Sequence, residues 1–180
     1  MSNFTHLDET GRMRMVDVGD KPATERQAAA SCRVRVGPKV FPLLMSGRLP
    51  KGDVWAAARL AGIMAAKNTA QLIPLCHTLP LNGVSIEFTP DPKHEAVIIL
   101  ARAHTFARTG VEMEALTAAA VAALTIYDMC KAVDRGLVIE YLQLEEKSGG
   151  ASGKYQRASN SPKNLVECGK VGVGNGTGSY

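Results

Sequence analysis

The fold is decided by the stretch VEMEALTAAAVAALTIYDMCKAVDR, Val111–Arg135, the longest helix-forming run in the chain. Gly136 follows it and is a typical residue after a helix end. At about 100° per residue, one set of its side chains falls within about 60° on the helix surface. The set comprises Met113, Leu116, Ala120, Leu124, Tyr127 and Lys131. We expect this apolar stripe to build the core, with a lysine at its end.

Shorter periodic segments surround this helix. Alternation or apolar runs predict strands at 28–36, 83–89, 96–103 and 137–145, helical segments at 40–47 and 54–73, and a loop at 104–110. Asp53 is the expected N-cap of the 54–73 helix. The order β-α-β-β-α-β predicts an α+β, ferredoxin-like fold, an antiparallel four-stranded sheet with helices on one face. Because the other face then lacks a cover, we expect oligomers.

The 180 residues suit one domain, which we divide into an N-terminal arm (1–14), a main body (15–150) and a flexible Gly/Ser/Lys-rich tail (151–180). The four cysteines form no CxxC pair, so we expect reduced thiols without a disulfide framework. The sequence shows no secretion signal and no long apolar span, which favours a cytoplasmic protein that does not bind membranes, although an organelle stays open.

The net charge of +4 is concentrated near the C-terminus. After Lys147 the chain holds Lys154, Arg157, Lys163 and Lys170 against Glu167, a balance of +3 that leaves about +1 for the rest. A nucleic-acid surface needs basic residues massed on one face. We therefore expect no nucleic-acid partner and favour a few placed cations around a small anionic ligand.

Asp128 and Lys131 lie one turn apart on the long helix, so their side chains can be neighbours. In a structural interpretation, Lys131 complements the negative end of the helix and Asp128 pairs with it. In a catalytic interpretation, the two form an acid/base pair. The spacing leaves both interpretations open.

At the other end of this helix, Thr109 and Glu112 fit a capping box, and Glu114 is favoured by the helix dipole. The same side chains could instead accept hydrogen bonds from the amino and amide edge of a purine-like ring.

Cys76 and His77 occupy the connection after the 54–73 helix. A single thiol is usually a packing residue, whereas His77 can contact phosphate or carry a proton. Lys51 and Gly52 precede a helix N-terminus, which attracts phosphate, although the pattern is weaker than a P-loop. Lys147 precedes two glycines and can equally be a solvated side chain.

Several separated motifs together resemble the cyclic pyranopterin monophosphate synthase family of molybdenum cofactor biosynthesis. They are MVDVG (15–19), KGD (51–53), PLCH (74–77), TGVEMEALTAAAVAALTIYDMCKAV (109–133) and KSGG (147–150). Because they span most of the body in the right order, the resemblance is more specific than any single motif.

The resemblance implies a lyase that converts 3',8-cyclo-7,8-dihydro-GTP, made by a radical partner enzyme, to cyclic pyranopterin monophosphate with release of pyrophosphate. It further implies a homohexamer, a trimer of dimers, with sites between subunits. The implied catalytic residues are Lys51, His77, Asp128 and Lys131, and the implied substrate-binding residues are Arg26, Leu75, Cys76, His77, Glu112, Met113, Glu114 and Lys147. No metal and no cofactor is expected. Lys131 is our general acid/base, with Asp128 orienting it.

Two other classes of protein compete with the enzyme. A nucleotide-sensing ferredoxin-like domain would bind GTP-like ligands without forming product. A structural assembly subunit would tolerate substitution of Lys51, Asp128 and Lys131. Weak RNA binding by the basic tail is a further alternative.

Overall fold

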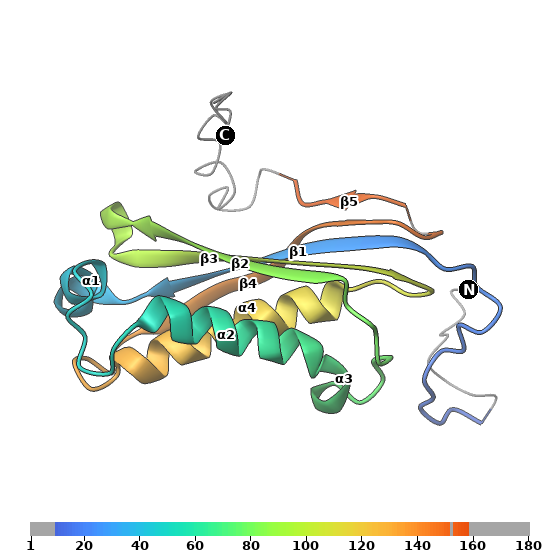
Figure 1. Ribbon diagram of the computed structural model, residues 1–180, viewed down its shortest axis with the longest axis horizontal. Coiled ribbons are helices and arrows are strands. Elements are labelled where there is room, and N and C mark those ends of the chain that lie inside the picture. The colour runs from blue at the N-terminus through green and yellow to red at the C-terminus, as the bar shows by residue number, and fades with distance from the viewer. Residues whose placement is uncertain (1–9, 152, 159–180) are drawn as a thin grey trace, which may run out of the picture.

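The computed structural model describes residues 10–151 and 153–158, and it consists of one antiparallel sheet with helices against one face (Figure 1). The strands are β1 Thr24–Arg35, β2 Gly83–Asp91, β3 Ala96–Ala107, β4 Val138–Ser148 and β5 Tyr155–Gln156. The helices are α1 Gly37–Met45, α2 Val54–Lys67, α3 Thr69–Leu72 and α4 Glu112–Cys130, with a 3-10 turn at Pro92–His94. The predicted α+β class and antiparallel sheet are confirmed.

The strand order is β2-β3-β1-β4-β5, so the prediction of four strands was one strand short. The fifth strand, β5, lies in the stretch that we assigned to the tail and pairs with β4 at Lys147↔Tyr155. It forms because backbone groups at the edge of β4 find partners there. Residues 1–9, 152 and 159–180, which include most of the predicted arm and tail, lie outside the described residues.

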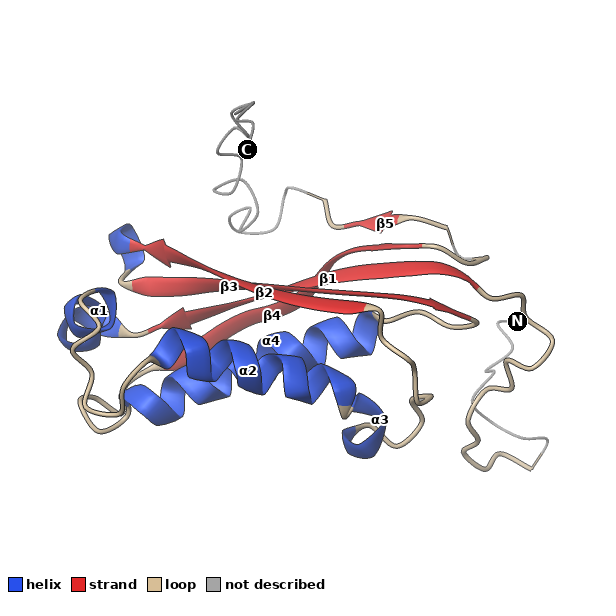
Figure 2. Cartoon of the chain, viewed as in Figure 1, coloured by secondary structure: helices blue, strands red, loops and turns tan. Residues whose placement is uncertain are grey.

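The sheet buries one face under α2 and α4, which lie side by side across it (Figure 2). Along β1, Ala28, Ala30, Cys32 and Val34 are at most 4% exposed, and Ala29 and Ser31 between them are buried as well. Burial does not alternate through the centre of β1, where the five consecutive residues 28–32 are all buried. The core therefore lies between β1, β3 and the two long helices.

The two long helices approach each other closely at Gly62 of α2. A methyl group built on Gly62 would lie 2.8 Å from the backbone oxygen of Ala118 and 2.2 Å from a terminal carbon of Ile86. Both distances are below van der Waals contact, so any larger side chain must push α4 away. Gly62 thus sets the helix spacing that the alanines of α4 also require.

We predict that Gly62→Val lowers the free energy of unfolding by about 2–3 kcal/mol, because overpacking a tight contact forces backbone shifts. The matched control is Ala56→Val on the exposed side of α2, where only a few tenths of a kcal/mol of helix propensity are at stake. Urea unfolding measures both variants. Equal midpoints for the two variants would contradict this account of the α2–α4 contact.

Several predicted boundaries were wrong, among them the start of β1 at Thr24 instead of Ala28 and the end of β4 at Ser148 instead of Glu145. Residues 104–107 continue β3 instead of forming a loop, because β1 begins early enough to pair Thr24 with Ala107 and Gln27 with His104. The predicted 54–73 helix breaks at Asn68, whose amide side chain bonds to the Met64 carbonyl and ends α2. Helix α4 ends at Cys130 instead of Arg135, since the chain turns at 131–133.

The predicted apolar stripe of α4 lies at the margin of the core, against which only its partly buried Leu116 and Tyr127 pack. Leu124 is 57% exposed and Met113 is 36% exposed, whereas Ala115, Ala122 and Ile126 are fully buried. Alanine faces inward because its small side chain allows α4 to lie close to both the sheet and α2. Although α4 is long and apolar enough to cross a membrane by composition alone, it is a helix packed into this core.

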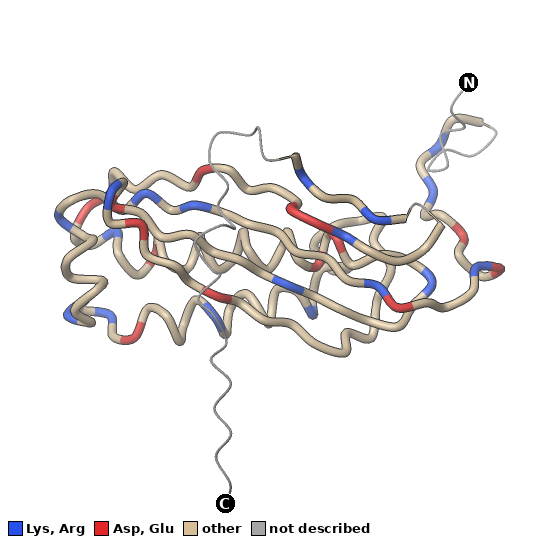
Figure 3. Tube along the Cα trace, turned by 90° about the horizontal axis from the view of Figure 1, so that it is seen from above, with Lys and Arg blue, Asp and Glu red and all other residues tan. Residues whose placement is uncertain are grey.

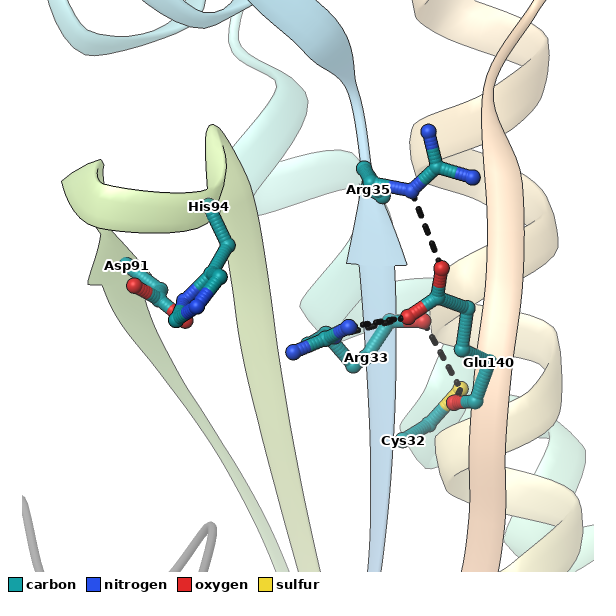
Figure 4. Close-up of polar contacts among 6 residues, drawn as sticks. All are labelled: Cys32, Arg33, Arg35, Asp91, His94 and Glu140. Atoms are coloured by element: carbon teal, nitrogen blue, oxygen red, sulfur yellow. Dashed lines mark hydrogen bonds and ion pairs between the residues drawn. The ribbon is translucent and has the colours of Figure 1, made fainter. Parts of the chain in front are cut away.

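Hydrogen-bonded charged side chains join β4 to β1 at one end of the sheet (Figure 4). Glu140 accepts hydrogen bonds from Arg33 Nε at 2.8 Å and from Arg35 Nε at 3.0 Å. The next residue, Tyr141, has a φ of +52°, and its ring lies 5.0 Å from the Arg33 guanidinium carbon. The pairing register of β4 shifts at the same place, so this cluster anchors an irregular strand.

Candidate active site

Three predicted catalytic residues meet where α4 ends and the chain enters α2. Asp128 lies in the last turn of α4, Lys131 follows that helix, and Lys51 precedes the Asp53 N-cap, whose carboxylate accepts from the Ala56 amide. Lys131 Nζ lies 2.7 Å from Asp128 Oδ1, and Lys51 Nζ donates to Asp128 Oδ2 at 2.9 Å. Lys51 also donates to the Asp128 backbone carbonyl at 2.9 Å. One carboxylate thus holds two ammonium groups that are 77 and three positions away in sequence.

The two lysines hold the pKa of Asp128 at about 2, through the hydrogen bond from Lys131 first and that from Lys51 second. The carboxylate therefore stays ionised throughout the physiological range. All three side chains are about half exposed, so water screens their attraction, and the cluster adds little to stability. Its net charge of about +1 at a solvent-facing position suits an anionic ligand.

We predict that Lys131→Met raises the pKa of Asp128 towards its ordinary value of 3.8, because the largest stabilisation of the charged form is lost. A carboxyl whose pKa is lowered by folding keeps its ion pair above the unfolded pKa and loses it as the pH falls through the folded value. The window therefore lies between about pH 4 and pH 2. A 13C NMR titration of the Asp128 carboxyl measures the shift. Lys67→Met is the control, and an unchanged Asp128 titration in Lys131→Met would contradict the pairing.

A second group of predicted residues gathers at the other end of α4. Glu114 is only 4% exposed, and burial raises its pKa, with the negative charge of Glu112 acting in the same direction. The predicted capping box is wrong: Val111 is the N-cap residue and no side chain caps the helix. Glu112 therefore does not take part in a capping box, and its carboxylate lies beside Gly110.

The loop that follows α3 carries Leu75, Cys76 and His77, and Cys76 is influenced by the charge of Glu114. Burial raises the pKa of the Cys76 thiol, and the negative charge of Glu114 raises it further. Leu75 and His77 are half-buried in the same loop. A buried carboxylate beside apolar side chains can accept the N-H edge of a flat heterocycle.

Arg26 and Lys147 lie on neighbouring strands near this end of the sheet. Arg26 Nη2 donates to the Arg108 carbonyl at 3.3 Å, just before α4 begins, while its Nε is buried with no partner among the described residues. Gly149 and Gly150 pass so close to Arg26 that a methyl group at Gly150 would lie 1.9 Å from the guanidinium. Lys147 pairs with Ala28 across β1 and β4.

The structure does not bring all predicted site residues together in one chain. Glu114 and Asp128 are 14 residues apart on α4, which corresponds to about 21 Å of helix. Groups that act on one reacting centre must lie within hydrogen-bond reach of it. The chain thus carries two half-sites at opposite ends of one helix.

A large hollow of about 590 Å³ lies elsewhere, on the sheet face away from α2 and α4. Of the predicted residues it includes only Lys147, and Glu25, Gln27, Arg102 and His104 lie beside it. It is therefore separate from both groups of predicted catalytic and heterocycle-binding residues. In the described part of the chain, no group of three His, Cys, Asp or Glu side chains could hold a metal.

Charged residues are spread along the molecule (Figure 3). In the described ranges, Lys and Arg do not gather on one face but alternate with Asp and Glu over both ends. A small anionic ligand therefore fits better than an extended polyanion.

One contact of a predicted site residue could not be predicted from the sequence. His77 Nε2 lies 2.8 Å from the backbone carbonyl of Val16, 61 positions away. The sequence predicted His77 but not this partner, because every residue has a carbonyl group and only the tertiary structure shows which one is near.

Comparison with known proteins gives consistent results. A model of the MoaC family matches residues 15–150. A relative from Pelotomaculum thermopropionicum is 57% identical over 157 residues, which is 87% of this chain and 92% of the relative. Relatives from Chloroflexus aurantiacus and Herpetosiphon aurantiacus are 58% and 59% identical, covering 87% and 85% of this chain and 96% and 93% of their own lengths. All three are named cyclic pyranopterin monophosphate synthase.

Proposed function

Because this chain belongs to the MoaC family, we propose that Lys51, Asp128 and Lys131 form the catalytic centre of a cyclic pyranopterin monophosphate synthase. The chain is an enzyme of molybdenum cofactor biosynthesis, and the resemblance inferred from its motifs is confirmed. Nothing favours the nucleotide-sensing alternative. The observation that carries the residue assignment is the single Asp128 carboxylate shared by two lysines.

The reaction that we propose converts 3',8-cyclo-7,8-dihydro-GTP to cyclic pyranopterin monophosphate and pyrophosphate. A hydroxyl of the substrate attacks the α-phosphorus, its proton passes to a base, and the bond to pyrophosphate breaks. Lys131 is the proposed general acid/base, and Asp128 orients it through the 2.7 Å contact. Lys51 has a second anchor on the Asp128 carbonyl, which suits it to hold a phosphate oxygen in a fixed place.

Charge supports this assignment. A triphosphate carries about four negative charges. Nearby cations stabilise the further negative charge that develops on pyrophosphate as it leaves. Lys51 and Lys131 supply two, Arg26 and Lys147 supply two more from β1 and β4, and His77 can add a donor. The four cations, of which one is offset by the Asp128 carboxylate, neutralise most of the charge of the substrate.

The other half-site suits the heterocycle. Glu114 and Glu112 offer carboxylate oxygens to guanidine-type N-H groups, while Leu75, Cys76 and Met113 provide apolar contact. Binding such donors would favour the ionised form of Glu114, against the burial that raises its pKa.

Two copies of the chain would unite the half-sites. Glu114 and Asp128 of one chain are separated by about 21 Å of helix. They can lie in one active site if one copy of the chain supplies Glu114 and another copy supplies Asp128. Exposed apolar side chains on the outer side of the helix layer support such contacts, since large apolar patches on a protein surface usually mark interfaces. They include Leu60, Met64 and Leu124, which are 54–60% exposed.

We therefore propose a homohexamer, a trimer of dimers, with active sites between subunits. The order β2-β3-β1-β4 with helices on one face supports a ferredoxin-like protomer, whose catalytic domain we place at 15–150. The substrate implies a radical partner enzyme upstream, and we place the protein in the cytoplasm with it.

The deciding experiment supplies the purified chain with the product of that radical enzyme. We expect pyrophosphate release and, after oxidation, pterin fluorescence, both in proportion to the amount of chain added. A ligand that binds without pyrophosphate release would instead support the nucleotide-sensing domain.

A further inference from the structure

The imidazole of His77 is oriented by the chain's N-terminal segment. Its Nε2 lies 2.8 Å from the carbonyl oxygen of Val16, which has no proton to donate. The hydrogen of this bond must therefore lie on Nε2. No other atom of the described chain makes a hydrogen bond to the ring, so Nδ1 is available to a ligand.

The segment that carries the Val16 carbonyl has its own local structure. Asp17 Oδ1 accepts from the Gly19 amide at 2.8 Å, and the Lys21 amide donates to the Val18 carbonyl at 3.1 Å. A side chain on an aspartate that accepts from the amide two residues later is an Asx turn. Val16 is half-buried between the exposed Met15 and Asp17, and its carbonyl oxygen contacts His77.

The loop that carries His77 is anchored at both ends but not at the ring. The Cys76 amide donates to the Ile73 carbonyl at 3.1 Å, and Thr105 Oγ1 on β3 donates to the Pro80 carbonyl at 2.6 Å. Thr105 is 1% exposed, so the second anchor is part of the core. These bonds place the backbone of the loop, and the Val16 carbonyl is the hydrogen-bond partner of the ring among the described residues.

We propose that Val16 is a positioning residue, whose carbonyl holds His77 with Nε2 protonated so that Nδ1 is the atom presented to substrate. This inference rests on the proposed function, in which His77 contacts the substrate. With Nε2 occupied, Nδ1 of the neutral ring can accept a proton from the substrate, and Nδ1-H of the charged ring can donate to a phosphate oxygen. The N-terminal segment thereby becomes part of the active site without touching the substrate.

The test compares Asp17→Ala, which removes the Asx turn, with Asp17→Asn, whose amide oxygen can still accept from Gly19. Asp20→Ala is the matched control, because it removes an exposed carboxylate three positions away that holds no such turn. The first readout is the His77 Nε2-H proton in 15N-histidine-labelled, substrate-free protein, assigned with His77→Gln. We expect this proton to be protected from exchange with water in the original chain, in Asp17→Asn and in Asp20→Ala, and to exchange rapidly in Asp17→Ala.

The second readout is steady-state pyrophosphate release. Misorientation of the ring should lower kcat about tenfold in Asp17→Ala with a smaller change in KM, and Asp17→Asn should restore most of it. An unprotected Nε2-H in the original chain, or full kcat in an Asp17→Ala variant whose ring is released, would overturn the inference. Failure of the proposed function looks different, because no variant would then release pyrophosphate while the substrate-free NMR result would still stand.

Discussion

A Lys131→Ala variant is expected to lose pyrophosphate release by at least about a hundredfold while keeping its fold, the usual scale for a lost general acid/base. Lys131 lies after the end of α4 with half of its side chain exposed, so no core contact is removed. Asp128 keeps its second partner, Lys51, and the cluster loses one ammonium group. The rate is measured with saturating substrate, so that a lower kcat is separated from weaker binding.

The control for this prediction is Lys67→Ala, which removes an exposed lysine at the end of α2. Both variants should melt within a few degrees of the original chain. Full turnover by a folded Lys131→Ala protein would remove the basis of its catalytic role and leave the helix-end interpretation, in which Lys131 only complements the C-terminus of α4.

Mixing two inactive variants should restore activity if the half-sites come from different copies of the chain. Glu114→Ala is defective at one end of α4 and Lys131→Ala at the other. In a mixed dimer, one site receives both defects and the other receives neither. With random exchange, about half of the dimers are mixed, and about a quarter of all sites are therefore intact.

Restoration to about a quarter of the original rate thus supports the two-copy site. The variants are unfolded and refolded together, and the same treatment of each variant alone is the control. A second control mixes Asp128→Ala with Lys131→Ala, whose defects share one half-site and cannot complement. If the Glu114→Ala and Lys131→Ala mixture stays inactive although mixed oligomers form, the active site belongs to a single copy.

The cluster of Lys51, Asp128 and Lys131 at the C-terminal end of α4 shows which contacts can be predicted from the sequence and which cannot. Spacing placed Asp128 and Lys131 one turn apart, and the 2.7 Å contact confirms that they are neighbours. It could not reveal that Lys51 shares the same carboxylate, because that contact joins residues 77 positions apart. Local geometry on a helix follows from residue number, whereas long-range contacts depend on how the helices pack.

The same helix shows where periodicity fails. The large apolar side chains indicated one stripe as the core, but the alanine face is buried and Leu124 is exposed. Hydrophobicity ranks leucine above alanine, yet at Gly62 the two helices leave space for nothing larger than small side chains. Leu124, exposed on that stripe, belongs to the surface that we propose for contacts between copies.

By itself, the sequence determined the α+β class, the antiparallel sheet, both long helical segments and the family, since alternation, helical periodicity and motifs are properties of local residue order. Only the tertiary structure decided which face of α4 is buried, that β3 extends to Ala107, that Lys51 joins Asp128, and that Val16 orients His77. Each of these depends on close packing or on a backbone group from a distant segment, and neither is encoded in the identity of a single residue.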